Sequence, residues 1–229
     1  IVDLFSHTTI SKLGQFIEKK EQQIDESIFI NYQPLPNEYF GENMRASGTG
    51  VIKFHFENDY VDRVKNIASK SNVEVFDVLI SMYLYLLTEI TQNKAVTIQY
   101  LKENSEMVVP LNVDLSSLKD FTELFKAVSK KRNGSQENKS YDIKQATALQ
   151  LKKESNHILP LVYMNSDISI DSKLLETYDT VFSLEENLTD QCLEFTCKFN
   201  DKRIKKEKMN YLIKAYIQLL KQLLNSYKL

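Results

Sequence analysis

Three histidines are the side chains of this 229-residue chain best suited to act as bases or metal ligands. His7, His55 and His157 lie far apart in the sequence and show no spacing typical of a metal site. His55 falls on the polar side of an alternating segment, and His157 comes directly before an apolar one. These positions favour exposed or structural roles, so we predict no catalytic histidine and no metal site.

The two cysteines lie in a single alternating segment, residues 192–199. Successive side chains of a β-strand point to opposite faces, so the odd separation of Cys192 and Cys197 places their sulfurs on opposite faces. Cys197 shares its face with Leu193, Phe195 and Phe199, which indicates a small core residue. We predict no disulfide, as expected for a cytoplasmic protein.

Motifs for nucleotide binding or nucleophilic catalysis do not occur in the sequence. There is no Gly-x-Ser-x-Gly motif, and Gly48-Thr49-Gly50 lacks the third glycine and the Lys-Ser/Thr pair that phosphate loops carry. The carboxylates are scattered, and their spacing selects no acid–base pair. The residue pattern therefore predicts no catalytic residue.

Composition and charge exclude two classes of partner. The formal net charge is −2, from 29 basic and 31 acidic residues, so we predict no nucleic-acid partner. The short basic runs at 130–132 and 202–206 are typical of solvated surface. The longest apolar stretch, near 80–87, is broken by Ser81 and is too short to cross a membrane.

The elements that position these residues fall into three segments. Residues 1–22 predict a short helix, with Leu13, Phe16 and Ile17 at helical spacing. Residues 23–49 predict a linker that holds Pro34 and Pro36, together with aromatic residues that could pack along a domain surface.

From residue 50 to residue 229 the pattern alternates between strands and helices, which predicts an α/β layered domain with a mixed sheet. We expect strands at 51–56, 95–100, 107–113, 158–164, 180–184 and 192–199. We expect helices at 59–69, 73–87, 118–128 and 142–152, and a last helix that contains residues 209–223.

Two parts of the sequence resemble known families. Val2–Leu13, with its Leu-Phe and Thr-Ile pairs, resembles the end of an acyl or peptidyl carrier domain. The carrier's phosphopantetheine serine lies upstream in that family. The resemblance therefore implies no cofactor in this chain, and phosphopantetheine on a neighbouring carrier domain.

Residues 50–229 resemble the C-terminal lobe of the nonribosomal peptide synthetase condensation-domain superfamily, which is related to chloramphenicol acetyltransferase. Residues 109–115 (VPLNVDL) followed by 121–125 (FTELF) resemble the family's "PLR-V-D … F-ELL" stretch. Residues 159–165 (LPLVYMN) resemble its "NPLFQVMFN" strand, and Phe199-Asn200 resembles its "YN" pair. The resemblance implies an α/β fold that forms a single chloramphenicol-acetyltransferase-like lobe, half of a condensation domain.

The resemblance also supplies candidate binding residues. They are Asn112, where the family usually has arginine, Tyr141, in the segment that corresponds to "HQDYPFE", Asn165 and Asn200. The family's catalytic HHxxxDG motif does not occur in the sequence, so we predict no catalytic residue here either.

Two functions remain open. In the first, the chain is a non-catalytic docking or interaction module of a peptide or hybrid polyketide assembly line. Its partners would be carrier domains and neighbouring modules, or a second copy bound through an exposed apolar face that a missing lobe would otherwise cover. In the second, it is the C-terminal lobe of an amide- or ester-forming enzyme whose other lobe is supplied separately. We expect the parent protein to be a multidomain synthetase and this chain itself to be inactive.

Overall fold

A computed structural model describes residues 33–41, 48–56, 58–134, 140–143, 156–164, 172–187 and 192–227. These residues belong to one structural unit, Asn31–Leu229. The predicted carrier-like helix at 1–22 and most of the predicted helix at 142–152 lie outside the described residues. At the start of the latter, Tyr141–Asp142 forms a short strand, so the helix prediction is wrong there.

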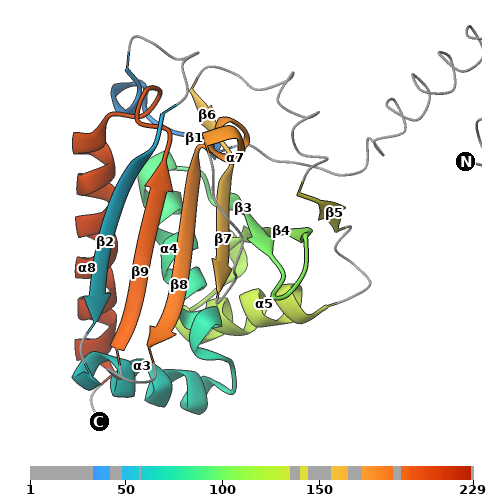
Figure 1. The fold of residues 1–229 in the computed structure, drawn as a ribbon. Helices are drawn as coiled ribbons and strands as arrows, with labels where there is room; N and C mark the ends of the chain where they lie inside the picture. The colour runs from blue at the N-terminus through green and yellow to red at the C-terminus, as the bar shows by residue number, and fades with distance from the viewer. Residues whose placement is uncertain are drawn as a thin grey trace, which may run out of the picture. The chain divides into compact units, whose positions relative to one another are not determined.

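A seven-stranded mixed sheet forms the centre of the unit (Figure 1). Its strands, in spatial order, are β2 (Gly50–Phe56), β9 (Cys192–Phe199), β8 (Thr180–Asn187), β7 (Pro160–Met164), β3 (Ala95–Leu101), β4 (Met107–Asp114) and β5 (Tyr141–Asp142). β7 runs parallel to both of its neighbours, and the other pairs are antiparallel. The predicted α/β class and mixed sheet are confirmed.

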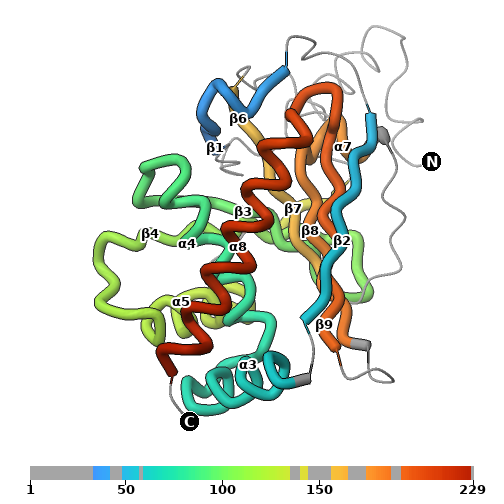
Figure 2. The backbone as a smooth tube through the Cα atoms, turned by 90° about the vertical axis from the view of Figure 1, so that its left-hand side faces the viewer, coloured from blue at the N-terminus to red at the C-terminus, as the bar shows by residue number. Residues whose placement is uncertain are grey.

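Four long helices lie on one side of this sheet, as Figure 2 shows. They are α3 (Asn58–Ser71), α4 (Val75–Thr91), α5 (Phe121–Asn133) and α8 (Lys206–Ser226). The shorter elements are α7 (Ser172–Thr177), η1 (Asn37–Tyr39), η2 (Leu115–Ser117) and a separate pair of strands, β1 (Gln33–Pro34) and β6 (His157–Ile158).

Aromatic side chains fill the layer between the sheet and the helices. Phe54 of β2 stacks on Phe195 of β9 with ring centroids 4.6 Å apart, and Tyr83 of α4 stacks on Phe182 of β8 at 5.3 Å. Tyr216 of α8 packs edge-on against Phe182 and donates a hydrogen bond to the Leu79 carbonyl at 3.1 Å. A single core thus joins helices and strands that are far apart in the sequence.

Cys197 belongs to this core, as its strand position predicts. It is buried, whereas Cys192 on the opposite face is half-buried, and the two do not form a disulfide. Burial raises the pKa of the Cys197 thiol from 9.0 to about 12, because an apolar environment disfavours the thiolate.

Residues 33–41 pack onto the lobe through buried apolar side chains, two of which are aromatic. Leu35, Tyr39 and Phe40 are buried. The Lys205 N–H donates to the Tyr39 carbonyl at 2.8 Å, which fixes the segment against the start of α8.

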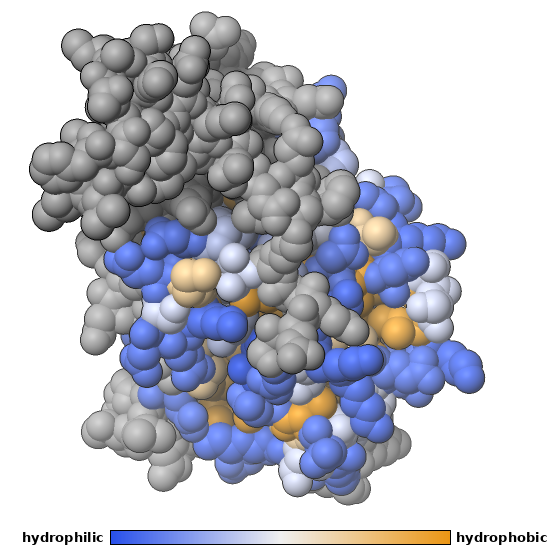
Figure 3. All heavy atoms as spheres, turned by 90° about the vertical axis from the view of Figure 1, so that its right-hand side faces the viewer, coloured by the Kyte–Doolittle hydropathy of each residue, from blue (hydrophilic) through white to orange (hydrophobic). Residues whose placement is uncertain are grey.

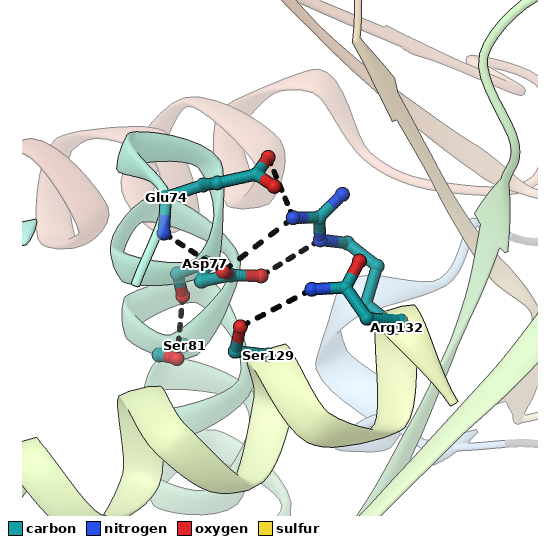
Figure 4. Close-up of polar contacts among 6 residues, drawn as sticks. Glu74, Asp77, Ser81, Ser129 and Arg132 are labelled. Carbon is teal, nitrogen blue, oxygen red and sulfur yellow. Dashed lines mark hydrogen bonds and ion pairs between the residues drawn. The ribbon is translucent and has the colours of Figure 1, made fainter. Parts of the chain in front are cut away.

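Two arginines inside the predicted solvated runs have side chains that are only 8% exposed. Arg132, at the end of α5, binds Asp77 on α4 with an Nε–Oδ1 distance of 2.7 Å (Figure 4). Arg203 binds the buried Asp179. Lys130, Lys202, Lys205 and Lys206 are exposed, so the prediction is right for these lysines and wrong for the two arginines.

Electrostatics explain why Arg132 stays charged. Burial acts to lower the pKa of its guanidinium, but the hydrogen bond and the negative charge of Asp77 outweigh it and hold the pKa above its ordinary value. The guanidinium also lies over the Phe76 and Tyr100 rings, at 5.9 and 5.8 Å from their centroids.

The expected exposed apolar face is not found among the described residues. Leu101, Leu161 and Val181 lie on the sheet face away from the long helices, yet each is at most 1 % exposed. The face of the molecule in Figure 3 shows small hydrophobic areas separated by hydrophilic side chains. These three side chains therefore do not form the exposed apolar face on which the homodimer prediction rests.

Candidate functional site

Polar side chains gather on β3 and β4, on the sheet face away from the long helices. Tyr100 points to the helices, because Arg132 lies over its ring. Side chains alternate along a strand, so Thr97 and Gln99 point to the opposite face. Asn112 of β4 lies directly opposite Thr97 in the register and shares that face.

Two tyrosines extend this group, which we call the Gln99 cluster (Thr97, Gln99, Asn112, Tyr141 and Tyr178). β5 pairs with β4 and places Tyr141 opposite Val108. The Tyr141 hydroxyl donates to Gln99 Oε1 at 2.9 Å, and the Tyr178 hydroxyl donates to the Tyr141 oxygen at 3.4 Å. The two hydroxyls and the amide therefore form one buried hydrogen-bonded chain.

Within the described part of the chain, two atoms of the Gln99 cluster have no hydrogen-bond partner. They are Gln99 Nε2 and Thr97 Oγ1, in side chains that are 0 % and 1 % exposed. A buried polar group without a partner costs about 1–3 kcal/mol. These atoms are the groups of the cluster that are available to a further acceptor.

A second polar group, the Asp179 cluster, consists of Asp179, Asn200 and Arg203 with the backbone of residues 157–159. It begins at the residue that follows Tyr178 of the Gln99 cluster. Arg203 binds the Asp179 carboxylate and donates to the His157 carbonyl at 2.6 Å. Asp179 Oδ2 also accepts the Leu159 N–H at 3.1 Å. The Arg203 guanidinium lies 5.2 Å from the Phe40 ring centroid, so it also holds the segment 33–41.

Asn200 forms the turn that follows β9. Its N–H donates to the Asp179 carbonyl at 3.0 Å, and its own carbonyl accepts the N–H groups of Arg203 and Ile204 at 3.2 and 2.8 Å. Its side-chain Oδ1 accepts the Lys202 N–H at 3.2 Å. These contacts give Asn200 a structural role that its place in the sequence does not reveal.

The structure brings two of the four predicted binding residues, Tyr141 and Asn200, into contact with neighbouring residues of the sequence, Tyr178 and Asp179. Tyr178 contacts Tyr141, and Asp179, the next residue, contacts Asn200. Asn112 lies on the same face of the sheet as Gln99, and Asn165 lies outside the described residues. A binding role for Asn112, Tyr141, Asn165 and Asn200 stays a prediction.

Sequence reasoning missed Gln99, Asp179 and Arg203. Gln99 was missed because a single polar residue within an apolar strand forms part of no recognisable motif. The burial of Arg203 has one signal in the sequence, the adjacent apolar residue Ile204, which is 0 % exposed. Arg132 had a clearer signal, because it continues the helical spacing of the buried Phe125 and Val128.

The described residues offer little acid–base chemistry. His55 is exposed on β2, and His157 Nδ1 lies 3.0 Å from Asn156 Oδ1. The Asp179 carboxylate already binds a guanidinium and an N–H group. Across the described segments, no group of three or more His, Cys, Asp or Glu side chains is placed to hold a metal ion. The hydrogen bonds of the two clusters join segments of this chain that lie far apart in the sequence.

Comparison with known proteins finds similar folds among solved structures. No family model matches the chain, and no curated protein sequence matches it. Among solved structures, the SgcC5 protein from Streptomyces globisporus is similar with a TM-score of 0.67 and 12% identity, over 92% of this chain and 55% of that one. The X-domain from teicoplanin biosynthesis is similar with a TM-score of 0.65 and 15% identity, over 93% and 58%.

The EpoB nonribosomal peptide synthetase cyclization-docking bidomain from Sorangium cellulosum is similar with a TM-score of 0.64 and 12% identity, over 92% of this chain and 48% of that one. The chain therefore has a fold similar to that of these solved structures. It spans about half the length of these structures, which fits a single condensation-like lobe. No helix in the described part of this lobe is long and apolar enough to span a membrane.

Proposed function

We propose that this condensation-like lobe is a non-catalytic docking or interaction module of a nonribosomal peptide or hybrid polyketide assembly line. One observation carries the proposal: the Asp179 cluster binds the chain to itself. Its carboxylate, guanidinium and turn residue contact residues 40, 157, 159 and 200–204 of the same lobe. Groups committed in this way stabilise the lobe, which suits a module that presents a fixed surface to its partners.

The histidines of the chain support the same function. Transfer of an acyl group to an amine needs a base within hydrogen-bond reach of the nucleophile. The sequence has three histidines and none is adjacent to another, so the chain itself contains no HHxxxDG motif. Among the described histidines, His55 is exposed on β2, and His157 contacts Asn156.

The partners that we propose are carrier domains and neighbouring modules of the same assembly line. Two structures of similar fold support an interaction role. One is a complex of the X-domain and OxyB from teicoplanin biosynthesis, with a TM-score of 0.64, and the other is the EpoB cyclization-docking bidomain. Phosphopantetheine would be carried by a neighbouring carrier domain, and the protein would act in the cytoplasm.

A second function is favoured by the unpartnered atoms of the Gln99 cluster. Gln99 Nε2 and Thr97 Oγ1 could bind an acceptor once another lobe brings a substrate to the site. In that case the chain would be the C-terminal lobe of an amide- or ester-forming enzyme that acts on carrier-bound thioesters.

One pair of measurements separates the two functions. The 229-residue chain is mixed with two carrier domains that hold aminoacyl thioesters, with and without a separately expressed lobe that contains an HHxxxDG motif. Complex formation is followed by light scattering and amide formation by mass spectrometry. Complexes without product in either mixture would support the docking module. Product that requires both lobes, and that falls at least tenfold with Gln99→Leu but not with the surface control Lys126→Gln, would establish the enzyme.

A further inference from the structure

β2 forms one edge of the sheet, and it is the longer of the two edges. It spans seven residues, Gly50–Phe56, and pairs along its whole length with β9. Among the described residues, no strand pairs with the other side of β2. The backbone N–H and C=O groups that point away from β9 therefore form a template for a further strand.

The apolar side chains of β2 are not fully covered at this edge of the sheet. Ile52 and Phe54 point towards the helices, but both are only half-buried. Phe54 stacks on Phe195 with an interplanar angle of 11°, so one face of its ring is covered by the neighbouring strand. A strand added at this edge would cover the remaining surface of both side chains.

The other side of β2 carries three exposed residues, of which Lys53 is the charged one. Val51, Lys53 and His55 are exposed, and Val51 is one of two large hydrophobic residues that are exposed in the described part of the chain. Their partners on β9 are Lys198, Thr196 and Glu194. The row therefore holds two lysines and one glutamate, which lies opposite His55 at the far end.

We propose that the β2 edge binds an extended segment of another protein as an additional strand, and that this segment alternates acidic and apolar side chains. The apolar side chains would lie against Ile52 and Phe54, and the acidic ones would lie on the side of Lys53. Main-chain hydrogen bonds would provide affinity and the alternate side chains would provide specificity, as in other complexes that form by strand addition.

A second copy of this chain is a poor occupant of the same edge. Residues 50–56 contain no acidic side chain. Any two-fold pairing of β2 with itself therefore leaves Lys53 without an opposite charge, and some registers place it against a second lysine. Like charges directly opposite in a sheet are destabilising, so Lys53 selects against self-pairing and for an acidic strand.

The test uses the full 229-residue chain and fluorescein-labelled heptapeptides that alternate glutamate and valine. Two control peptides carry lysine in place of glutamate, or proline in place of the central valine, which removes a main-chain donor. The matched protein variants are Lys53→Glu at the edge and Lys126→Glu on the exposed surface of α5. Circular dichroism establishes that both variants fold.

The expected result is binding of the acidic peptide, with loss of binding for the proline peptide. Lys53→Glu should weaken the acidic peptide about tenfold and improve the lysine peptide, while Lys126→Glu changes neither. Deuterium uptake at 50–56 should fall when the acidic peptide binds. No acidic-peptide binding at millimolar concentration, equal affinity for the acidic and lysine peptides, equal effects of the two variants, or protection elsewhere would each overturn the proposal. A dimer of the chain alone that protects 50–56 would assign the edge to a second copy and overturn it as well.

Discussion

Replacing Arg132 by methionine should destabilise the lobe by about 3–5 kcal/mol, because it leaves a buried carboxylate without its cation. Asp77 is 0 % exposed and receives the Arg132 guanidinium at 2.7 Å on Oδ1 and 3.5 Å on Oδ2. In the variant its remaining donor is the Glu74 N–H at 3.0 Å. One backbone hydrogen bond does not offset the loss of a buried ion pair.

The contact of Arg132 with Glu74 contributes much less. Glu74 lies 2.6 Å from the guanidinium, but its side chain is 62% exposed. Exposed ion pairs are worth about 0–1 kcal/mol, so Glu74→Gln should cost less than about 1 kcal/mol. Asp77→Asn combined with Arg132→Met should recover part of the loss, because the uncompensated charge is then removed.

Urea unfolding followed by far-UV circular dichroism measures these differences, since the chain has no tryptophan to report by fluorescence. With a urea dependence near 2 kcal/mol per molar, Arg132→Met should lower the midpoint by about 2 M. A midpoint within about 0.5 M of the parent protein would refute the reasoning. So would a double variant no more stable than Arg132→Met alone.

Three further predictions follow from other buried groups. Arg203→Met should leave the Asp179 carboxylate without its cation and remove the contact with the Phe40 ring, which loosens residues 33–41. Limited proteolysis should then cut this segment faster, and an unchanged cleavage rate would contradict the prediction. Tyr141→Phe removes the donor to Gln99 Oε1 and should cost about 1–3 kcal/mol in urea unfolding, whereas no loss would show that the acceptor finds another partner. The pKa of Cys197 is raised from 9.0 to about 12 in the folded state, so its contribution to stability is complete below pH 9 and is lost as the pH rises towards 12. Cys197→Ala should therefore reduce the alkaline loss of unfolding free energy, and equal slopes for the two proteins would contradict the assignment.

Local pattern predicted the elements that have strong periodicity. The alternation at 51–56 and 192–199 and the apolar stripe of the last helix correspond to β2, β9 and α8. The predicted strand at 158–164 is interrupted at Leu159, because the Asp179 carboxylate takes its N–H group. Such contacts join residues that are distant in the sequence, so no local pattern reports them. The same limit hid the Gln99 cluster, in which Tyr141 was predicted from the family resemblance and Gln99 and Tyr178 were not.

The pairing of β2 with β9 sets the order in which the lobe can fold. β2 lies near residue 50, and its partner strand lies near residue 195. Contacts at such separation form late, because the chain between them must be ordered first. During synthesis, the helices α3 to α5 and the β3–β4 hairpin can assemble while Phe54 and Phe56 still lack Phe195. The β2 segment therefore stays available to chaperones, or to wrong partners, until residues 192–199 have been made.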